Sequence, residues 1–92
     1  MYWDVVEVTP EPDWCLRVRF ADGLRGRVRF APDYFTGVFE VLRDPERFRQ
    51  VFVDQGAVAW PGDLDLAPDA MHRAIQEHGE WLLSGQPQDA RV

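Results

Sequence analysis

The sequence has no lysine, a single cysteine and no apolar run close to the length of a membrane span. One cysteine allows no internal disulfide, which fits a reducing compartment. A membrane-spanning helix needs about 20 consecutive apolar residues. The first residues, MYWDVVEV, also lack the basic stretch followed by an apolar one that marks a signal peptide. We therefore expect a soluble, cytoplasmic protein without a membrane partner.

Side chains that carry catalysis or bind metals are also scarce. His72 and His78 are six residues apart, whereas zinc-binding histidine pairs on a helix are spaced i, i+4. With one cysteine and no third imidazole, the ligand set of a structural zinc site is missing. Neither a glycine-rich phosphate loop nor a Gly-x-Ser-x-Gly motif is present. These absences predict a non-catalytic protein with no metal and no cofactor.

The chain does contain enough apolar residues for one folded unit. Its 92 residues make a single domain, and a hydrophobic content of 46% argues against disorder. The last segment, SGQPQDARV, has the composition of a loop. We predict a single α+β domain over residues 1–83 and a flexible C-terminal tail over residues 84–92.

Alternation of apolar and polar residues predicts the strands. Residues 14–20 and 24–30 each place apolar side chains on one face. A three-residue loop at 21–23 keeps the two apolar faces together, because the side-chain period of a strand is two. A first strand at 5–9 is expected to end at the prolines of PEPD. A second hairpin, VFVD and AVAW, turns at Gln55-Gly56.

The same register gathers five arginines on the polar face of the first hairpin. Like charges directly opposite each other destabilise a sheet, so something must neutralise them. The candidates are Glu7 of the first strand with scattered acidic residues, or an anionic partner. Cys15, the one candidate thiol nucleophile, is expected among these positive charges, and two alternatives follow: a thiol whose pKa they lower, or the inert thiol that is usual for a lone cysteine. We call the set the arginine face: Arg17, Arg19, Arg25, Arg27 and Arg29.

Two further segments carry helical signals. Residues 32–49 predict two short helical turns that cover the sheet with phenylalanine side chains. From Pro68 to Leu83 the apolar positions step by four, three and four, which predicts one helix with a packed His78 on its apolar stripe. Together the elements predict an α+β fold with a small antiparallel sheet of about five short strands, short helical turns and one C-terminal helix.

The block AWPGDLDLAPD lies between the last predicted strand and this helix. Trp60 ends the strand, and Pro61-Gly62 has the order preferred at the centre of a type II turn. Pro68 suits the first helical turn, and Asp65 is expected to cap the helix. A calcium loop here would need a glycine and a glutamate at positions held by proline and alanine. The block therefore indicates a turn and a helix start rather than a metal site.

The order of motifs resembles an uncharacterised bacterial family catalogued as domain of unknown function 2442. The resemblance runs from Trp3 to His72 through VRFADG, GVFEVLRDPERF and VDQGAVAWPGDLDLAPDAM. Family members usually carry Asn-Gly after Trp-Pro and a tyrosine near the end of that block, whereas this chain has Gly62 and His72 there. The resemblance implies a small α+β domain, a toxin–antitoxin-like pairing with another small protein, and no known catalytic residues. It assigns a structural role to the motif residues Trp60, Pro61, Gly62 and Asp65.

A binding role therefore fits better than catalysis. We predict a non-catalytic protein–protein interaction module, the antitoxin-like or adaptor half of a small two-protein pair. The overall charge of −6 favours a basic protein partner. The alternative is a nucleic-acid or anion-binding module that reads phosphates through the arginine face. Edge strands of a small sheet also pair between copies, so a homodimer stays open.

Overall fold

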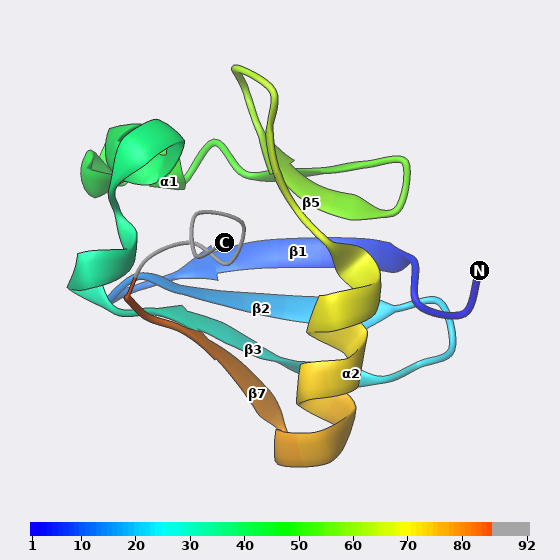
Figure 1. Cartoon of the computed structure of the whole chain (residues 1–92). Coiled ribbons are helices and arrows are strands. Elements are labelled where there is room, and N and C mark those ends of the chain that lie inside the picture. The colour runs from blue at the N-terminus through cyan, green and yellow to red at the C-terminus, as the bar shows by residue number, and fades with distance from the viewer. Residues whose placement is uncertain (86–92) are drawn as a thin grey trace.

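The computed structural model describes residues 1–85, which form two small β-sheets with helices packed against them (Figure 1). The predicted α+β class is confirmed. Residues 1–85 contain seven strands rather than about five, and these divide into a four-stranded and a three-stranded sheet. The elements are β1 (Val5–Glu11), β2 (Cys15–Phe20), β3 (Arg25–Phe30), the 3₁₀ helices η1 (Pro32–Tyr34) and η2 (Gly37–Arg43), α1 (Pro45–Phe48), β4 (Phe52–Asp54), β5 (Ala57–Trp60), β6 (Leu64–Leu66), α2 (Pro68–His78) and β7 (Glu80–Leu83).

The larger sheet, in the order β1-β2-β3-β7, contains the predicted hairpin. Leu16 pairs with Val28 and Val18 with Gly26, as the odd loop requires. The loop is held by the Asp22 carboxylate, whose Oδ1 accepts a hydrogen bond from the backbone N–H of Leu24 at 3.0 Å. Sequence register alone therefore predicted correctly which side chains share each face of this hairpin.

Strand β1 is longer than predicted, because it continues through Pro10 to Glu11. Proline has no N–H to donate to a neighbouring strand, so it is tolerated where one side of the strand is unpaired. Strand β1 is at the edge of the four-stranded sheet and pairs there with β2 alone. The prediction that proline ends the strand was wrong for this reason.

The smaller sheet, in the order β4-β5-β6, lies beside β1 (Figure 1). The backbone N–H of Val5 donates to the carbonyl of Gly56 at 2.8 Å and links the two sheets. Trp60 ends β5 as predicted, and Gly62 has a φ of 95° in the following turn. Asp65 lies inside β6 and does not cap the helix, whose N-cap is Ala67. Strand β6 had not been predicted.

Helix α2 begins at Pro68 as predicted but ends at His78, five residues early. Gly79 stops it in a left-handed conformation with a φ of 81°. The chain then forms β7, which pairs with β3 in parallel, so the sheet is mixed rather than antiparallel. His78 and Leu82 are exposed, so the predicted packed role of His78 was wrong. The buried histidine is His72, at 3% exposure.

The core lies between the two sheets, α2 and the short helices. Its centre is aromatic: Phe30, Phe35, Phe48 and Trp60 make mutual ring contacts. The indole N–H of Trp60 donates to the backbone carbonyl of Phe48 at 2.9 Å, so this buried polar atom is satisfied. The helical segment at 32–49 covers the sheet as predicted, with three short helices instead of two turns. No helix in residues 1–85 is long and apolar enough to cross a membrane.

Candidate interaction surface

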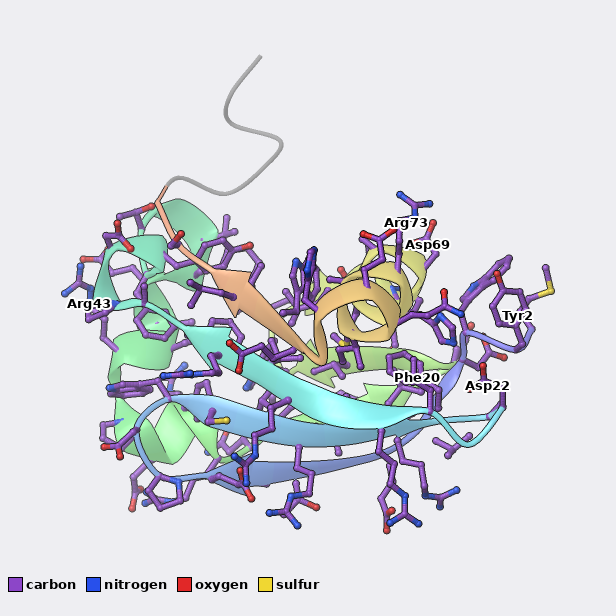
Figure 2. The ribbon with its side chains drawn as sticks, turned by 90° about the horizontal axis from the view of Figure 1, so that it is seen from below. Tyr2, Phe20, Asp22, Arg43, Asp69 and Arg73 are labelled. Atoms are coloured by element: carbon purple, nitrogen blue, oxygen red, sulfur yellow. The ribbon has the colours of Figure 1, made fainter. Side chains whose placement is uncertain are left out.

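The arginine face lies on the outer side of the four-stranded sheet, turned away from α2. Figure 2 shows the sheet nearly edge-on, with α2 on one side and projecting side chains on the other. Arg17 pairs with Arg27, and Arg19 with Arg25, in the predicted register. Arg29 lies opposite Cys15. The guanidinium groups are accessible: the side chains of Arg17, Arg27 and Arg29 are more than half exposed.

Glutamates on the two edge strands neutralise much of this face. Glu7 of β1 accepts from Arg19 at 3.1 Å, as the sequence had indicated. Glu11, also on β1, lies 2.8 Å from Arg17. The Oε1 atom of Glu11 also lies 3.4 Å from the Nε atom of Arg27. One carboxylate therefore holds two arginines that would otherwise repel each other across the β2–β3 pair.

The remaining two arginines, Arg29 and Arg25, differ in whether they form an ion pair. Arg29 reaches Glu80 of β7 at 3.5 Å. Arg25 forms no ion pair with any residue in the described part of the chain. The face thus combines five positive with three negative side chains, and it keeps a positive excess on a chain whose overall charge is −6.

Cys15 occupies the predicted position opposite Arg29, but a lowered pKa, one of the two alternatives for its thiol, is not found. Burial and then the negative charge of Glu11 raise the pKa of the Cys15 thiol. Arg27 and Arg29 act in the opposite direction and do not compensate. The position of Cys15 on the arginine face therefore does not lower the pKa of its thiol.

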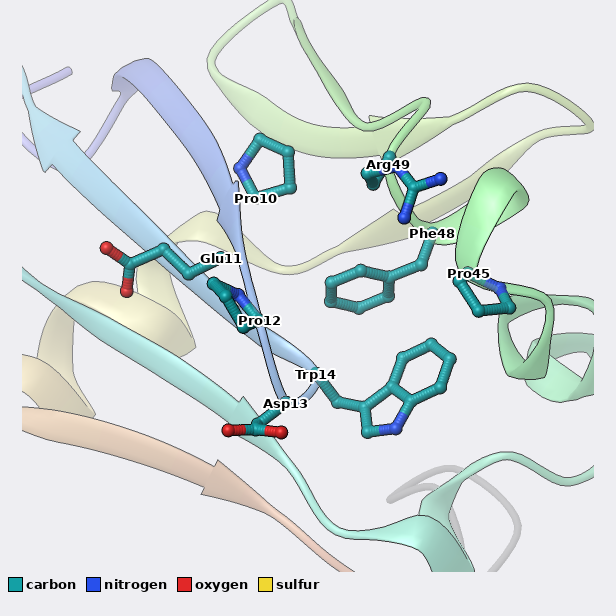
Figure 3. Close-up of a pocket in the computed structure, with 8 residues that line it drawn as sticks. All are labelled: Pro10, Glu11, Pro12, Asp13, Trp14, Pro45, Phe48 and Arg49. Atoms are coloured by element: carbon teal, nitrogen blue, oxygen red, sulfur yellow. The ribbon is translucent and has the colours of Figure 1, made fainter.

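An apolar hollow of about 400 Å³ adjoins the arginine face at the β1–β2 turn (Figure 3). Asp13 and Trp14 in this turn have φ values of 65° and 60°, a backbone conformation that residues other than glycine rarely adopt. This backbone places the Trp14 ring edge-on to Phe35 and Phe48, with centroids 5.2 Å away in both cases. The sequence pattern had placed Trp14 at the start of the second strand, whereas β2 begins at Cys15 and Trp14 lies in the turn before it. The lining residues are Pro10, Glu11, Pro12, Asp13, Trp14, Pro45, Phe48 and Arg49.

The family-motif residues belong to the smaller sheet and its β5–β6 turn and lie outside the arginine face. Trp60 is buried at 2% exposure, while Pro61, Gly62 and Asp65 are exposed around the β5–β6 turn. Within residues 1–85, no group of three or more histidine, cysteine, aspartate or glutamate side chains is placed to hold a metal ion. The motif therefore orders the small sheet, and the arginine face lies on the other one.

A second polar feature, missed by sequence reasoning, joins the β2–β3 loop to α2. The Nε2 atom of His72 lies 2.8 Å from Oδ2 of Asp22. The N–H of Leu24, and then His72, hold the pKa of the Asp22 carboxyl below its ordinary value. Fifty positions separate the two side chains, so no local spacing could indicate the pair.

The geometry defines a small α+β domain with a charged, uncovered sheet face. The profile of a family described as protein of unknown function (DUF2442) matches residues 5–77. The chain belongs to this family. No curated protein and no solved structure matches the chain.

Proposed function

We propose that this chain is a non-catalytic protein-interaction module that binds its partner through the arginine face. The observation that carries the proposal is the exposed sheet surface on which five arginines of the central strands are flanked by three glutamates of the edge strands. A solvent-exposed β-sheet face of mixed charge offers a defined two-dimensional pattern. A partner protein can complement such a pattern residue by residue, which gives specificity and orientation.

The carboxylates favour a protein over a nucleic acid. Binding to a phosphate backbone depends on cations that are free to replace the counterions of the polyanion. Here four of the five arginines already have a glutamate partner. A phosphate strand laid on this face would also approach Glu7, Glu11 and Glu80, whereas a folded partner can place positive groups opposite them.

The partner is expected to be a small protein, with this chain as the antitoxin-like or adaptor half of the pair. The overall charge of −6 favours encounter with a protein of basic overall charge. The contact itself needs acidic side chains opposite Arg25 and its neighbours. The cytoplasm is the expected compartment, because a lone cysteine fits reducing conditions.

A pull-down from the native host tests this proposal. We expect one small protein to remain bound after nuclease treatment. Replacing Arg17, Arg19, Arg25 and Arg27 together with glutamine should abolish its recovery and leave the far-UV spectrum unchanged. The matched control replaces four arginines outside the arginine face with glutamine: Arg43, Arg47, Arg49 and Arg73. Undiminished binding by the four-arginine variant would contradict the proposal.

A nucleic-acid or anion-binding module is the second candidate, favoured by one observation. Arg25 has no ion-pair partner among residues 1–85 and lies opposite Arg19. In this case nuclease treatment should remove the bound material. The logarithm of the binding constant should also fall steeply and linearly with the logarithm of the salt concentration. A weak salt dependence would exclude it.

The absence of catalysis is part of the proposal and has its own test. The raised pKa of the Cys15 thiol supports it, because the thiolate is the reactive form. We expect Cys15 to react with iodoacetamide no faster than a free model thiol at neutral pH. Faster alkylation would reopen the case for an enzyme that uses Cys15 as its nucleophile.

A further inference from the structure

A cavity of about 220 Å³ lies between the N-terminal turn and α2, away from the arginine face. Figure 2 shows its surroundings: Tyr2 from the N-terminal turn, with Asp69 and Arg73 on α2. Trp3, His72 and Gln76 complete the lining. Indole, imidazole, guanidinium and amide groups therefore border one small space.

The His72 ring is fixed in the wall of this cavity. Its side chain is 4% exposed, and its Nε2 atom is held by Asp22. Phe20 and Tyr2 contact the ring edge-on, with centroids 4.8 Å and 5.0 Å away. Burial, aromatic packing and the hydrogen bond leave the imidazole a single orientation.

The second nitrogen of this ring, Nδ1, has no hydrogen-bond partner among residues 1–85. Every fully buried polar side-chain atom in the described chain does have a partner. The Nδ1 atom must therefore reach solvent, and the cavity that the ring lines provides that access. A nine-tenths buried side chain thus presents an unused polar atom to a small space.

The groups around this space are mostly hydrogen-bond donors. An imidazole that carries a hydrogen on both nitrogens can donate from Nδ1 into the cavity while Nε2 donates to Asp22. Arg73 is exposed, and no ion pair or hydrogen bond of its side chain exists within residues 1–85. The Trp3 indole N–H likewise makes no hydrogen bond with the described residues. Asp69 is the one acidic side chain in the lining.

We propose that this cavity binds a small ligand through an oxyanion, a carboxylate or a phosphate group. Arg73 supplies a charge-assisted hydrogen bond, and the Nδ1 atom of His72 and the indole N–H of Trp3 supply two further donors. Asp69 weakens the binding of a simple anion by charge repulsion. The site is independent of the arginine face, which belongs to the opposite side of the sheet.

Titration with two simple anions, followed by NMR, tests the site. The imidazole resonances of His72 and the indole N–H of Trp3 are observed while inorganic phosphate or acetate is added. We expect a saturable shift of both signals. Arg73→Gln should weaken binding about tenfold, as expected for the loss of a charge-assisted hydrogen bond, and Asp69→Asn should strengthen it. Arg47→Gln, an equal charge change on α1 outside the cavity, is the matched control and should leave the affinity unchanged.

The two anions distinguish a ligand that binds through a phosphate group from one that binds through a carboxylate. Saturation by phosphate alone assigns a phosphate ligand, and saturation by acetate assigns a carboxylate. The proposal is overturned if neither anion gives a saturable shift, or if Arg47→Gln weakens binding as much as Arg73→Gln does. It is also overturned if the four-arginine variant of the arginine face abolishes the shift, since the anion would then bind there.

Discussion

Gly26 of β3 lies directly beneath Ile75 of α2, with no room for a side chain between them. A β-carbon added to Gly26 would overlap the Ile75 side chain and lie 3.0 Å from the carbonyl oxygen of Gly79. The absence of a side chain lets the helix approach the sheet. We predict that Gly26→Ala lowers the free energy of unfolding by about 1–3 kcal/mol, the usual cost of overpacking a core. Urea denaturation at equilibrium measures it.

The control for this prediction is a double variant that combines Gly26→Ala with Ile75→Ala. Ile75→Ala alone should cost about 2–5 kcal/mol, because it leaves a cavity. In the double variant the new methyl group at position 26 partly fills that space, so the combined loss should be smaller than the sum. Additive losses would contradict close packing as the reason for the glycine.

The β2–β3 hairpin was predictable because its determinants are local. The alternation on both sides of residues 21–23 determines which residues face the core. The same alternation is sufficient to place Arg17 opposite Arg27 and Arg19 opposite Arg25. The ion pair of Glu7 with Arg19 follows from the position of β1 next to β2. The side-chain period of two and the odd number of loop residues were sufficient to predict the register of this hairpin.

The C-terminal part was not predictable in the same way. The apolar steps of α2 continue past its true end, so Leu82 looked like the next position of the helical stripe. Gly79 was the local stop signal, but the parallel pairing of β7 with β3 connects segments about fifty residues apart. The buried histidine is His72 rather than His78, and the partners that contact it, Asp22 and Phe20, are distant in the sequence. The spacing of apolar residues along the chain does not indicate such contacts between distant segments.

The β4–β5 turn offers a stabilising substitution. Gln55 and Gly56 form a two-residue loop, and both have positive φ values, 52° and 84°. Asparagine tolerates this conformation better than glutamine does, and Asn-Gly is the preferred pair in such turns. We predict that Gln55→Asn raises the free energy of unfolding by about 0.5 kcal/mol. Gln76→Asn, the same change inside α2, should have the opposite sign because asparagine is the poorer helix former. A thermal unfolding series measures both.

The Asp22–His72 pair predicts a pH-dependent stability. The pKa of Asp22 is lowered in the folded state, below its ordinary value of 3.8. Its contribution is therefore present above pH 3.8 and is lost as the pH falls through the lowered value. We expect Asp22→Asn to destabilise the protein at pH 7 and to show a smaller difference from the unmodified chain near pH 3. Urea denaturation of both proteins at the two pH values measures this.

The comparison isolates Asp22, because the two proteins differ in this one carboxylate. Tyr2, Asp69 and Arg73, which border the same cavity as His72, are unchanged. Asp54→Asn is the matched control, since this exposed carboxylate of β4 makes no side-chain hydrogen bond or ion pair within residues 1–85. An equal effect of Asp22→Asn at both pH values would show that its charge has no role in folding.

Glu11 is the carboxylate on which the arginine face depends most, because it holds both Arg17 and Arg27. Exposed ion pairs are worth about 0.2–1 kcal/mol each. We therefore predict that Glu11→Gln lowers the free energy of unfolding by about 1 kcal/mol at low salt and by less at high salt. Glu46→Gln, which removes a long and highly exposed pair with Arg49 at 3.8 Å, should have almost no effect.

The same substitution separates the two proposed functions and changes the chemistry of Cys15. Without the Glu11 charge the pKa of the thiol should fall, so iodoacetamide alkylation at fixed pH should become faster. A polyanion should bind the more positive face more tightly, with a steeper salt dependence. A protein partner that pairs with the mixed pattern should gain nothing and lose specificity. Tighter retention of nucleic acid by Glu11→Gln, measured by a salt titration of binding, would therefore favour the anion-binding module over the protein-interaction module.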